Sequence, residues 1–323
     1  MKTNPVVSVL DAVMVTRPVL LIPVWGFSAL GFRCAANSSN THWSFFPKHL
    51  PSASDYLLLS VFSLSVAAVY IFNQIADIEV DKKNGGLPLI ASGIVPLNVA
   101  VLSSVLFSII SLLLPLLLHH SPLALCSGAA LLLGVVYSFR PLRFSGKPIL
   151  DFISNATGYG FIAFGAGWYI GGNQLLTVEF IKSALPYFLL MCAGSISSTL
   201  PDIEGDRQDG KITSAVMLGE MCAHSVALVL LIAAGEAGFL RRDPAALICA
   251  LASLPLYIGY LVNPGRFFME ATYKIGGALC MAAAFLIMPW FLPVAGVVFT
   301  ATWLYFRIRH ETSYPSLIPI NKS

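Results

Sequence analysis

The chain has 323 residues, of which 57% are hydrophobic and 11% are charged, whereas an ordinary soluble domain carries about 25% charged residues. Its net charge of +3 is too small to indicate a nucleic-acid partner. Its six cysteines include no CxxC pair, so they indicate neither a disulfide framework nor a thiolate metal site. The composition therefore predicts an integral membrane protein surrounded by lipid.

Membrane-spanning helices can be placed along most of the chain, because a span needs about 20 mostly apolar residues. Nine segments meet this requirement, and an apolar stretch at 293–306 can add a tenth span. We expect an all-α, polytopic helical bundle that forms one domain over residues 1–323. The nine predicted spans are 18–36, 55–76, 96–118, 123–139, 149–171, 183–201, 223–240, 245–263 and 275–290.

The Lys and Arg residues give the orientation, since short cytoplasmic loops carry an excess of both. With the N-terminus inside, eleven of the nineteen lie in the N-terminal segment and in the loops after spans two, four, six and eight. Arg307 and Arg309 follow the same rule only if a tenth span returns the C-terminus to the inside. We expect a multi-pass protein in a plasma membrane of the bacterial type.

An acidic pattern occurs twice, at the ends of spans two and six. NQIADIEVDKKN contains Asp77 and Asp81, and PDIEGDRQDG contains Asp202 and Asp206, at a constant offset along the chain. Both copies follow even-numbered spans and therefore face the cytoplasmic side. An internal repeat that relates the segments around 55–95 and 183–222 would produce this arrangement.

The spacing of these aspartates indicates a metal site. Residues four apart lie on one helical face, so Asn73, Asp77 and Asp81 form one polar stripe, and Asp202 and Asp206 form another. Glu79 and Glu204 fall outside the stripes and are expected in solvent. Facing carboxylates repel unless cations lie between them, and Mg²⁺ is the cation that typically binds one or two carboxylates together with phosphate oxygens.

Basic residues on the same side would complete a phosphate site, because Arg can bind phosphate oxygens with two parallel hydrogen bonds. The positive-inside rule alone would also explain these residues. The candidates beside the aspartates and in the loop YSFRPLRFSGK are Arg140, Arg143, Lys147, Arg207 and Lys211. Arg17, before Pro18, is explained equally by anchoring and by acceptor binding.

These motifs resemble the paired aspartate-rich motifs of the UbiA superfamily of intramembrane prenyltransferases, and the homogentisate-type members most closely. The resemblance includes the downstream segments LPLIASG (87–93) and EGDRQDGKIT (204–213). It implies a helical bundle around a central cavity and an allylic polyprenyl diphosphate bound through Mg²⁺. It also implies roles for particular residues. The metal ligands would be Asn73, Asp77, Asp81, Asp202 and Asp206, and Tyr137, Arg140 and Arg143 would lie near the diphosphate.

Catalysis of this kind needs charge stabilisation on the departing diphosphate and a cavity that keeps water from a carbocation. The four aspartates are the expected catalytic residues, and aromatic side chains could line the cavity. The aromatic candidates are Phe72, Phe152, Tyr159, Phe161 and Trp168. Asp151 and Asn155 could contact a polar acceptor or only cap and pack.

The sequence therefore predicts an Mg²⁺-dependent transfer of a polyprenyl group to a lipophilic, aromatic acceptor in quinone or pigment lipid synthesis. Two alternatives stay open. The acceptor could be a tetrapyrrole or a glycerol phosphate, because DIEGDR-like motifs also occur in such relatives. A cation transporter could use the same carboxylates, although transport would be better served by acids in the middle of the membrane.

Overall fold

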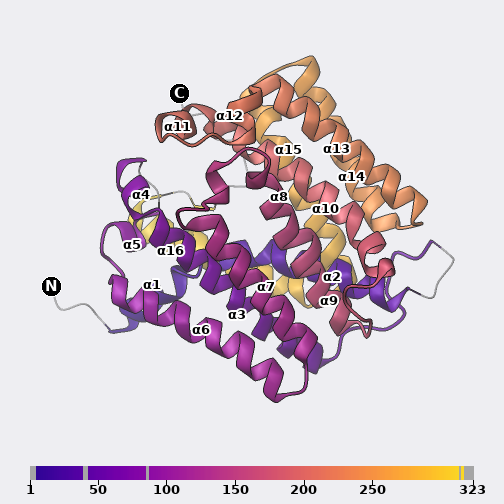
Figure 1. Cartoon of the computed structure of the whole chain (residues 1–323), viewed down its shortest axis with the longest axis horizontal. Coiled ribbons are helices and arrows are strands. Elements are labelled where there is room, and N and C mark those ends of the chain that lie inside the picture. The colour runs from indigo at the N-terminus through magenta and orange to yellow at the C-terminus, as the bar shows by residue number, and fades with distance from the viewer. Residues whose placement is uncertain (1–4, 39–42, 85–86, 313, 316–323) are drawn as a thin grey trace.

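The computed structural model describes residues 5–38, 43–84, 87–312 and 314–315, and within these ranges the regular elements are all helices (Figure 1). The long helices are α2 (Leu21–Ala36), α3 (Ala53–Ala76), α6 (Leu97–Leu117), α7 (Ser121–Ser138), α10 (Val178–Thr199), α13 (Glu220–Leu240), α14 (Pro244–Val262), α15 (Arg266–Ile287) and α16 (Phe291–His310). The predicted all-α bundle is confirmed.

Nine helical stretches of the described chain are long and apolar enough to cross a membrane, and α16 is the last of them. The predicted fifth span is also helical, but it consists of three seven-residue pieces: α8 (Leu150–Ala156), the π-helix η3 (Thr157–Ala163) and α9 (Phe164–Ile170). The stretch at 293–306, which we expected to add a possible tenth span, is part of the long helix α16. The chain is a multi-pass membrane protein.

The last of the nine predicted spans begins earlier than expected. We placed its start at residue 275, whereas α15 begins at Arg266. The polar residues that suggested a loop lie one turn apart, and Glu270 accepts hydrogen bonds from Arg266 Nε at 2.7 Å and Lys274 Nζ at 2.6 Å. Charged side chains that pair along a helix face are compatible with a helical start.

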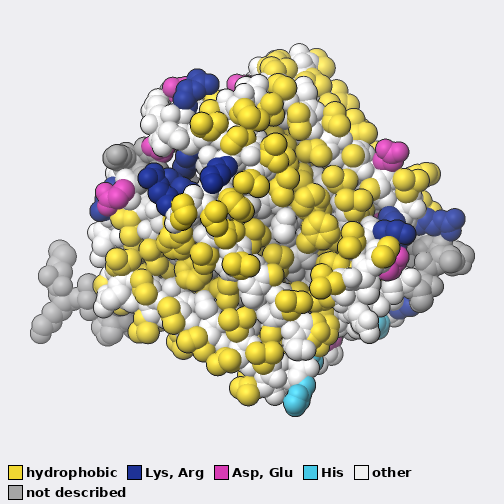
Figure 2. Space-filling model, viewed as in Figure 1, with side chains coloured by type: hydrophobic (Ala, Val, Ile, Leu, Met, Phe, Trp, Pro, Cys, Tyr) yellow, Lys and Arg dark blue, Asp and Glu magenta, His cyan; other side chains and the backbone are white. Residues whose placement is uncertain are grey.

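Apolar side chains cover much of the outside of the bundle, as expected for a protein in lipid. Leu102, Leu132 and Val229 are each more than 60% exposed. In Figure 2 hydrophobic side chains form a broad band, and Lys, Arg, Asp and Glu gather at its two ends. We call the end that carries α4, α5, α11 and α12 the aspartate end (Figure 1).

Helices α2 and α9 approach each other closely because glycines lie where they cross. A Cβ atom added to Gly31 would overlap the backbone carbonyl of Phe164, and one added to Gly167 would overlap that of Ser28. The Ser28 hydroxyl donates to the Ala163 carbonyl at 2.8 Å. Small residues at such crossings let helices pack in a membrane, where no hydrophobic driving force holds them together.

A buried ion pair joins three helices at the end opposite the aspartates. Arg33 Nη1 on α2 lies 2.5 Å from Asp243 Oδ1 at the start of α14, and Tyr187 of α10 donates to Asp243 Oδ2 at 2.8 Å. Asp243 also caps α14 by accepting from the backbone N–H groups of Ala245 and Ala246. The partners satisfy both buried charges, so this cluster fixes α2, α10 and α14 relative to one another.

Replacing Gly167 should destabilise the bundle. Gly167→Ala is expected to cost about 1 to 3 kcal/mol, because overpacking of a close contact forces backbone shifts. Thermal unfolding in detergent measures the loss. Gly277→Ala on α15 is the matched control, since no atom lies within 4 Å of an added Cβ there. Equal melting temperatures for the two variants would contradict the close approach of α2 and α9.

Candidate functional site

The first aspartate motif follows a bend at the end of α3. This helix ends at Ala76, and Asp77 has φ −102° and ψ 12° before α4 (Ile78–Asn84) begins. Hydrogen bonds from Asp77 N to Asn73 O (3.0 Å) and from Asp81 N to Asp77 O (2.8 Å) continue across the bend. The four-residue spacing is thus kept in space, and Asn73 Nδ2 donates to Asp77 Oδ2 at 3.2 Å.

The second motif has the same local shape. Helix α10 is followed by a 3-10 turn, η4 (Leu200–Asp202), and by α11 (Ile203–Gln208), and Asp202 has φ −101° and ψ 2°. The first aspartate of each motif therefore lies at a helix bend with nearly identical backbone angles. Glu79 and Glu204 are exposed, as expected, and pair with Lys82 and Arg207. A duplication of the longer segments around 55–95 and 183–222 stays a prediction.

Each motif has one aspartate that pairs with a basic side chain. Arg143 Nη2 lies 3.0 Å from Asp77 Oδ1, and Lys211 Nζ lies 3.6 Å from Asp206 Oδ1. Lys211 is also close enough to Asp81 for their charges to interact, which links the two motifs. Burial raises the pKa of Asp81, and the charge of Asp77 raises it further, whereas Arg17 and Lys211 oppose this rise.

The oxygen atoms of the two aspartate motifs are the kind of ligand that Mg²⁺ binds. Among the described residues, no three His, Cys, Asp or Glu side chains form a ready-made metal cluster. Mg²⁺ does not need one, because it keeps several waters and is usually held by one or two carboxylates and substrate phosphates. Each motif offers two carboxylates, which is sufficient for an ion shared with a phosphate group.

The structure brings only some of the predicted basic residues to the aspartates. Arg143 and Lys211 reach them, but Arg140 and Lys147 are exposed, and the Lys147 ammonium lies over the Phe144 ring at 6.0 Å. Arg207 is not brought to the site either, since its half-exposed side chain pairs with Glu204 at 3.6 Å. The positions of these basic residues in the sequence could not reveal which way their side chains point.

A cavity of about 260 Å³ opens beside the first motif, between α2, α3, α7 and the α8–η3 run. Asn73 and Tyr137 line it, and so do Tyr70, Asn155 and Tyr159. Asn155 Nδ2 lies 3.4 Å from the Tyr137 hydroxyl and 3.1 Å from Ser195 Oγ. The cavity gives a substrate a place next to the aspartates that is partly apolar and partly polar.

Most of the aromatic residues that we expected in the cavity lie elsewhere. Of the five, Tyr159 lines it, whereas Trp168 is 1% exposed in the core and Phe161 packs against Phe188 at 4.9 Å. Phe72 packs against Phe139, and Phe152 joins the packing of α10 and α13. The expectation failed because aromatic content alone does not tell which side of a helix faces a cavity.

Asp151 has a structural role. It is 4% exposed and accepts hydrogen bonds from the backbone N–H of Ser214 at 2.7 Å and from the Ser214 hydroxyl at 2.6 Å. This contact ties α8 to α12 (Ser214–Leu218), which follows the second motif. Of the two readings left open for Asp151, capping and packing is the one observed.

Arg17 is the residue that sequence analysis weighed too little. It has φ 49° and ψ 61°, a left-handed conformation that is uncommon outside glycine. It lines the cavity, and its buried Nε has no hydrogen-bond partner among the described residues. The only signal in the sequence was an Arg before the Pro that starts a helix. In the structure Arg17 places a cation at the cavity.

A second group near Asp202 was also missed. Glu270, 4% exposed, and Lys274 form an ion pair on α15, and Glu270 is close enough to Asp202 for their charges to interact. We had placed both residues before the predicted span. Lys274 therefore adds a cation on the side of the second motif.

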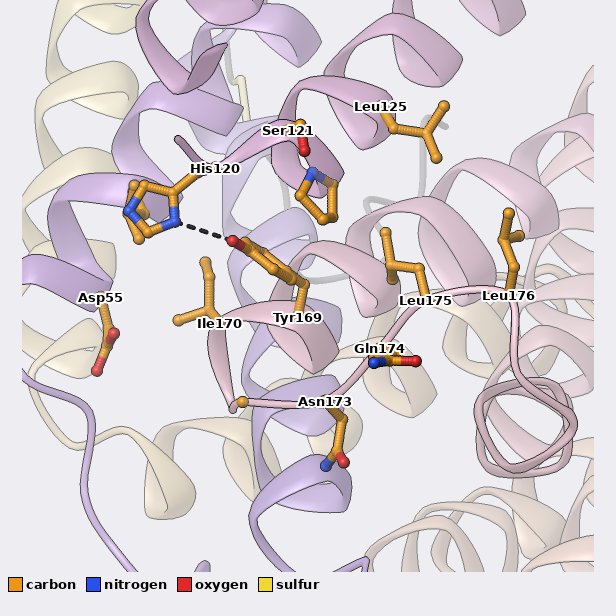
Figure 3. Close-up of a pocket in the computed structure, with 13 residues that line it drawn as sticks. Asp55, His120, Ser121, Leu125, Tyr169, Ile170, Asn173, Gln174, Leu175 and Leu176 are labelled. Atoms are coloured by element: carbon orange, nitrogen blue, oxygen red, sulfur yellow. Dashed lines mark hydrogen bonds between the residues drawn. The ribbon is translucent and has the colours of Figure 1, made fainter. Parts of the chain in front are cut away.

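A larger hollow of about 730 Å³ lies away from the aspartates, where α3 and α7 begin and α9 ends. Figure 3 shows its polar groups, with the His120 ring 2.9 Å from the Tyr169 hydroxyl and Asp55 at one side. The residues that line it include no Lys or Arg. It lacks the cations that a diphosphate needs.

Comparison with known proteins gives the family. Residues 42–272 match the UbiA prenyltransferase family. The chain belongs to this family. A UbiA homolog from Archaeoglobus fulgidus, solved with GPP and Mg²⁺, is similar in fold, with a TM-score of 0.61 and 22% identity over 86% of this chain and 99% of that one.

Two curated relatives show how the similarity divides within the UbiA family. The chain is 29% identical over 193 residues to digeranylgeranylglyceryl phosphate synthase of Sulfolobus acidocaldarius, which is 59% of this chain and 65% of that protein. It is 34% identical over 157 residues to probable homogentisate phytyltransferase 2 of Oryza sativa, covering 46% of this chain and 40% of that protein. The chain thus spans less than two thirds of the length of these relatives.

Arg143 should contribute to anion binding at this site. Arg143→Gln is expected to weaken the binding of inorganic diphosphate with Mg²⁺ about tenfold, since a charge-assisted hydrogen bond contributes roughly 1.5 kcal/mol. Isothermal titration calorimetry measures the dissociation constant. Arg207→Gln is the control and should leave it unchanged, because Arg207 pairs with an exposed Glu204. Equal losses of affinity in the two variants would show that diphosphate binding depends only on the net charge, and would contradict a specific role of Arg143.

Proposed function

We propose that this UbiA-family protein transfers a prenyl group from an allylic diphosphate to an acceptor, with Mg²⁺ binding the diphosphate. One observation carries the proposal. Two aspartate motifs with matching backbone shape lie at one end of the bundle, each with a basic partner, and a cavity opens beside the first motif. The Archaeoglobus homolog with GPP and Mg²⁺ supports this assignment of the ligands.

Each part of the site has a role in this reaction. Asn73, Asp77, Asp81, Asp202 and Asp206 would hold Mg²⁺, which when bound stabilises negative charge on the diphosphate. The allylic C–O bond breaks, and its electron pair stays on the diphosphate oxygen. Arg143 and Lys211 stabilise that charge as it develops. The acceptor then forms a bond to the allylic carbon and loses a proton.

The 260 Å³ cavity is the proposed place of the acceptor, because it opens beside Asn73 of the first aspartate motif. Tyr70, Tyr137 and Tyr159 line it, and the hydroxyls of Tyr70 and Tyr159 lie 2.9 Å apart. Aromatic rings pack well against a planar acceptor, while their hydroxyls bind its polar substituents. An aromatic acceptor, as used for quinone or pigment lipids, suits this lining.

A glycerol-phosphate acceptor is the second candidate. The similarity to the Sulfolobus synthase extends over 193 residues, longer than the 157 residues shared with the rice phytyltransferase. Arg17, with its unpartnered Nε at the cavity, could bind an acceptor phosphate or carboxylate.

Ion transport is less well supported. Asp77 and Asp206 are paired with basic side chains and lie at helix ends. A cation pathway would need acids within the membrane. The basic loops at the aspartate end favour a cytoplasmic position for that end of the bundle.

A transfer assay tests the activity. Purified protein receives labelled farnesyl, geranylgeranyl or phytyl diphosphate, Mg²⁺, and either hydroxylated aromatic acids or a prenylated glycerol phosphate. Product from the aromatic acids alone supports the first acceptor class, and product from the glycerol phosphate alone supports the second. Absence of product with every acceptor would overturn the proposed function.

Asp77 and Asp202 should act together. Asp77→Ala and Asp202→Ala are each expected to lower the transfer rate at least about 100-fold, because each removes part of one charge-stabilising clamp. The double variant should lose little more, as groups that act as a unit are not additive. Glu204→Ala, at an exposed carboxylate two residues from Asp202, is the control and should keep its activity. Fully additive losses would contradict a shared clamp.

A further inference from the structure

The cavity beside the first aspartate motif is polar at one end and apolar at the other. Asn73 lines it from the last turn of α3, and Val66 lines it from seven residues earlier, which is about 10 Å farther from the aspartate end along the helix axis. The fifth span begins at the aspartate end, where α8 is tied to α12. Along this span the polar Asn155 comes before the apolar Ala163, and both line the cavity. A ligand therefore finds polar partners beside the aspartates and an apolar wall beyond them.

Gly158 lines the cavity between these two ends, at the second residue of the π-helix η3. Among the described residues outside its own helical turn, a Cβ atom added to Gly158 would have one neighbour within 4 Å, Leu133 Cδ2 at 3.7 Å. This is an ordinary van der Waals distance, and Leu133 of α7 is itself a lining residue. The space beside Gly158 is therefore part of the cavity, and π-helical turns within α-helical segments often occur at functional sites.

Close helix packing does not account for Gly158, although it accounts for other glycines nearby. A Cβ atom added to Gly160, in the same π-helix, would overlap the backbone of Phe188 on α10. A Cβ atom added to Gly134, which also lines the cavity, would overlap the Val69 side chain. Gly158 has no such close neighbour among the described residues, and glycine is a weaker helix former than alanine. The room that Gly158 leaves is open to a ligand.

We propose that Gly158 sets the size of the apolar part of the acceptor, with Leu133 as the facing wall. The proposal rests on the proposed function. The polar group of the acceptor lies toward Asn73 and Asn155, and its ring substituent or alkyl chain lies between Gly158 and Leu133. A side chain added at Gly158 fills this space, so the π-helix determines which acceptors fit by size.

The test uses the full-length protein with Gly158→Ala, alone and combined with Leu133→Ala. Gly128→Ala is the matched control. Gly128 lies on α7, and a Cβ atom added there would also meet a single leucine atom, Leu112 Cδ2 at 3.6 Å. Gly128 is not among the residues that line the cavity.

Each protein is assayed for thermal stability, prenyl diphosphate affinity, and kcat/KM for two acceptors of the class that the transfer assay identifies. For aromatic acids, the two are a hydroxybenzoic acid without and with a propyl substituent. For glycerol phosphates, the two carry a short and a long alkyl ether. The measured quantity is the ratio of kcat/KM between the bulkier and the smaller acceptor.

Gly158→Ala should lower this ratio about tenfold, because one methylene group in an apolar pocket changes discrimination by about that factor or more. The melting temperature should not fall, and prenyl diphosphate affinity should stay unchanged. Adding Leu133→Ala should restore the ratio, since it removes the one side chain that the new methyl group meets. Gly128→Ala should keep the wild-type ratio.

An unchanged ratio in Gly158→Ala, or an equal shift in Gly128→Ala, would overturn the proposal while the activity stands. A shift that Leu133→Ala does not restore would contradict the position of the apolar part between these two residues. A lower melting temperature for Gly158→Ala than for Gly128→Ala would also overturn the proposal, because the methyl group would then disturb helix packing. A wild-type protein that forms no product with any acceptor overturns the proposed function instead, and that result is read before any variant is compared.

Discussion

Repulsion among four aspartates gathered at one end of the bundle is the constraint on which the site depends. The structure answers it with cations from segments that follow the spans. Arg143 comes from the loop after α7, and Lys211 comes from the turn after α11. A hydrogen bond from Ile212 N to Gly146 O at 3.2 Å joins these two segments, and the Asp151–Ser214 contact joins them again. The cations are therefore held in place relative to each other as well as to the carboxylates.

The two ends of the bundle differ in how they are held. At the end opposite the aspartates, Arg33 and Asp243 form a buried pair, and glycines bring α2 and α9 into direct backbone contact. At the aspartate end, the Arg143–Asp77 and Lys211–Asp206 pairs are partly exposed. A buried frame at one end and partly exposed charges at the other suit a site whose charged residues are held in place by the bundle and can still be reached by a ligand.

The sequence predicted much of this arrangement. The helical bundle followed from apolar length, and the two stripes followed from the four-residue spacing of Asn73, Asp77 and Asp81. The directions of side chains did not follow. Arg207 and Lys211 lie four residues apart, but only Lys211 reaches an aspartate, because the chain leaves the helix after Gln208. Arg17 was hidden for a similar reason, since it lines the cavity with a left-handed backbone that no local pattern predicts.

The π-helix η3 sets the rotational phase of the fifth span. An α-helix turns by about 100° per residue, and a π-helix accommodates an additional residue in a turn. Before η3, α8 directs Asn155 to the cavity, and after it, α9 directs Gly167 to α2. The wider turn lies between these two contacts. A regular α-helix over the same residues would turn one of the two contacts away from its partner, so the π-helix lets one span serve both the cavity and the crossing with α2.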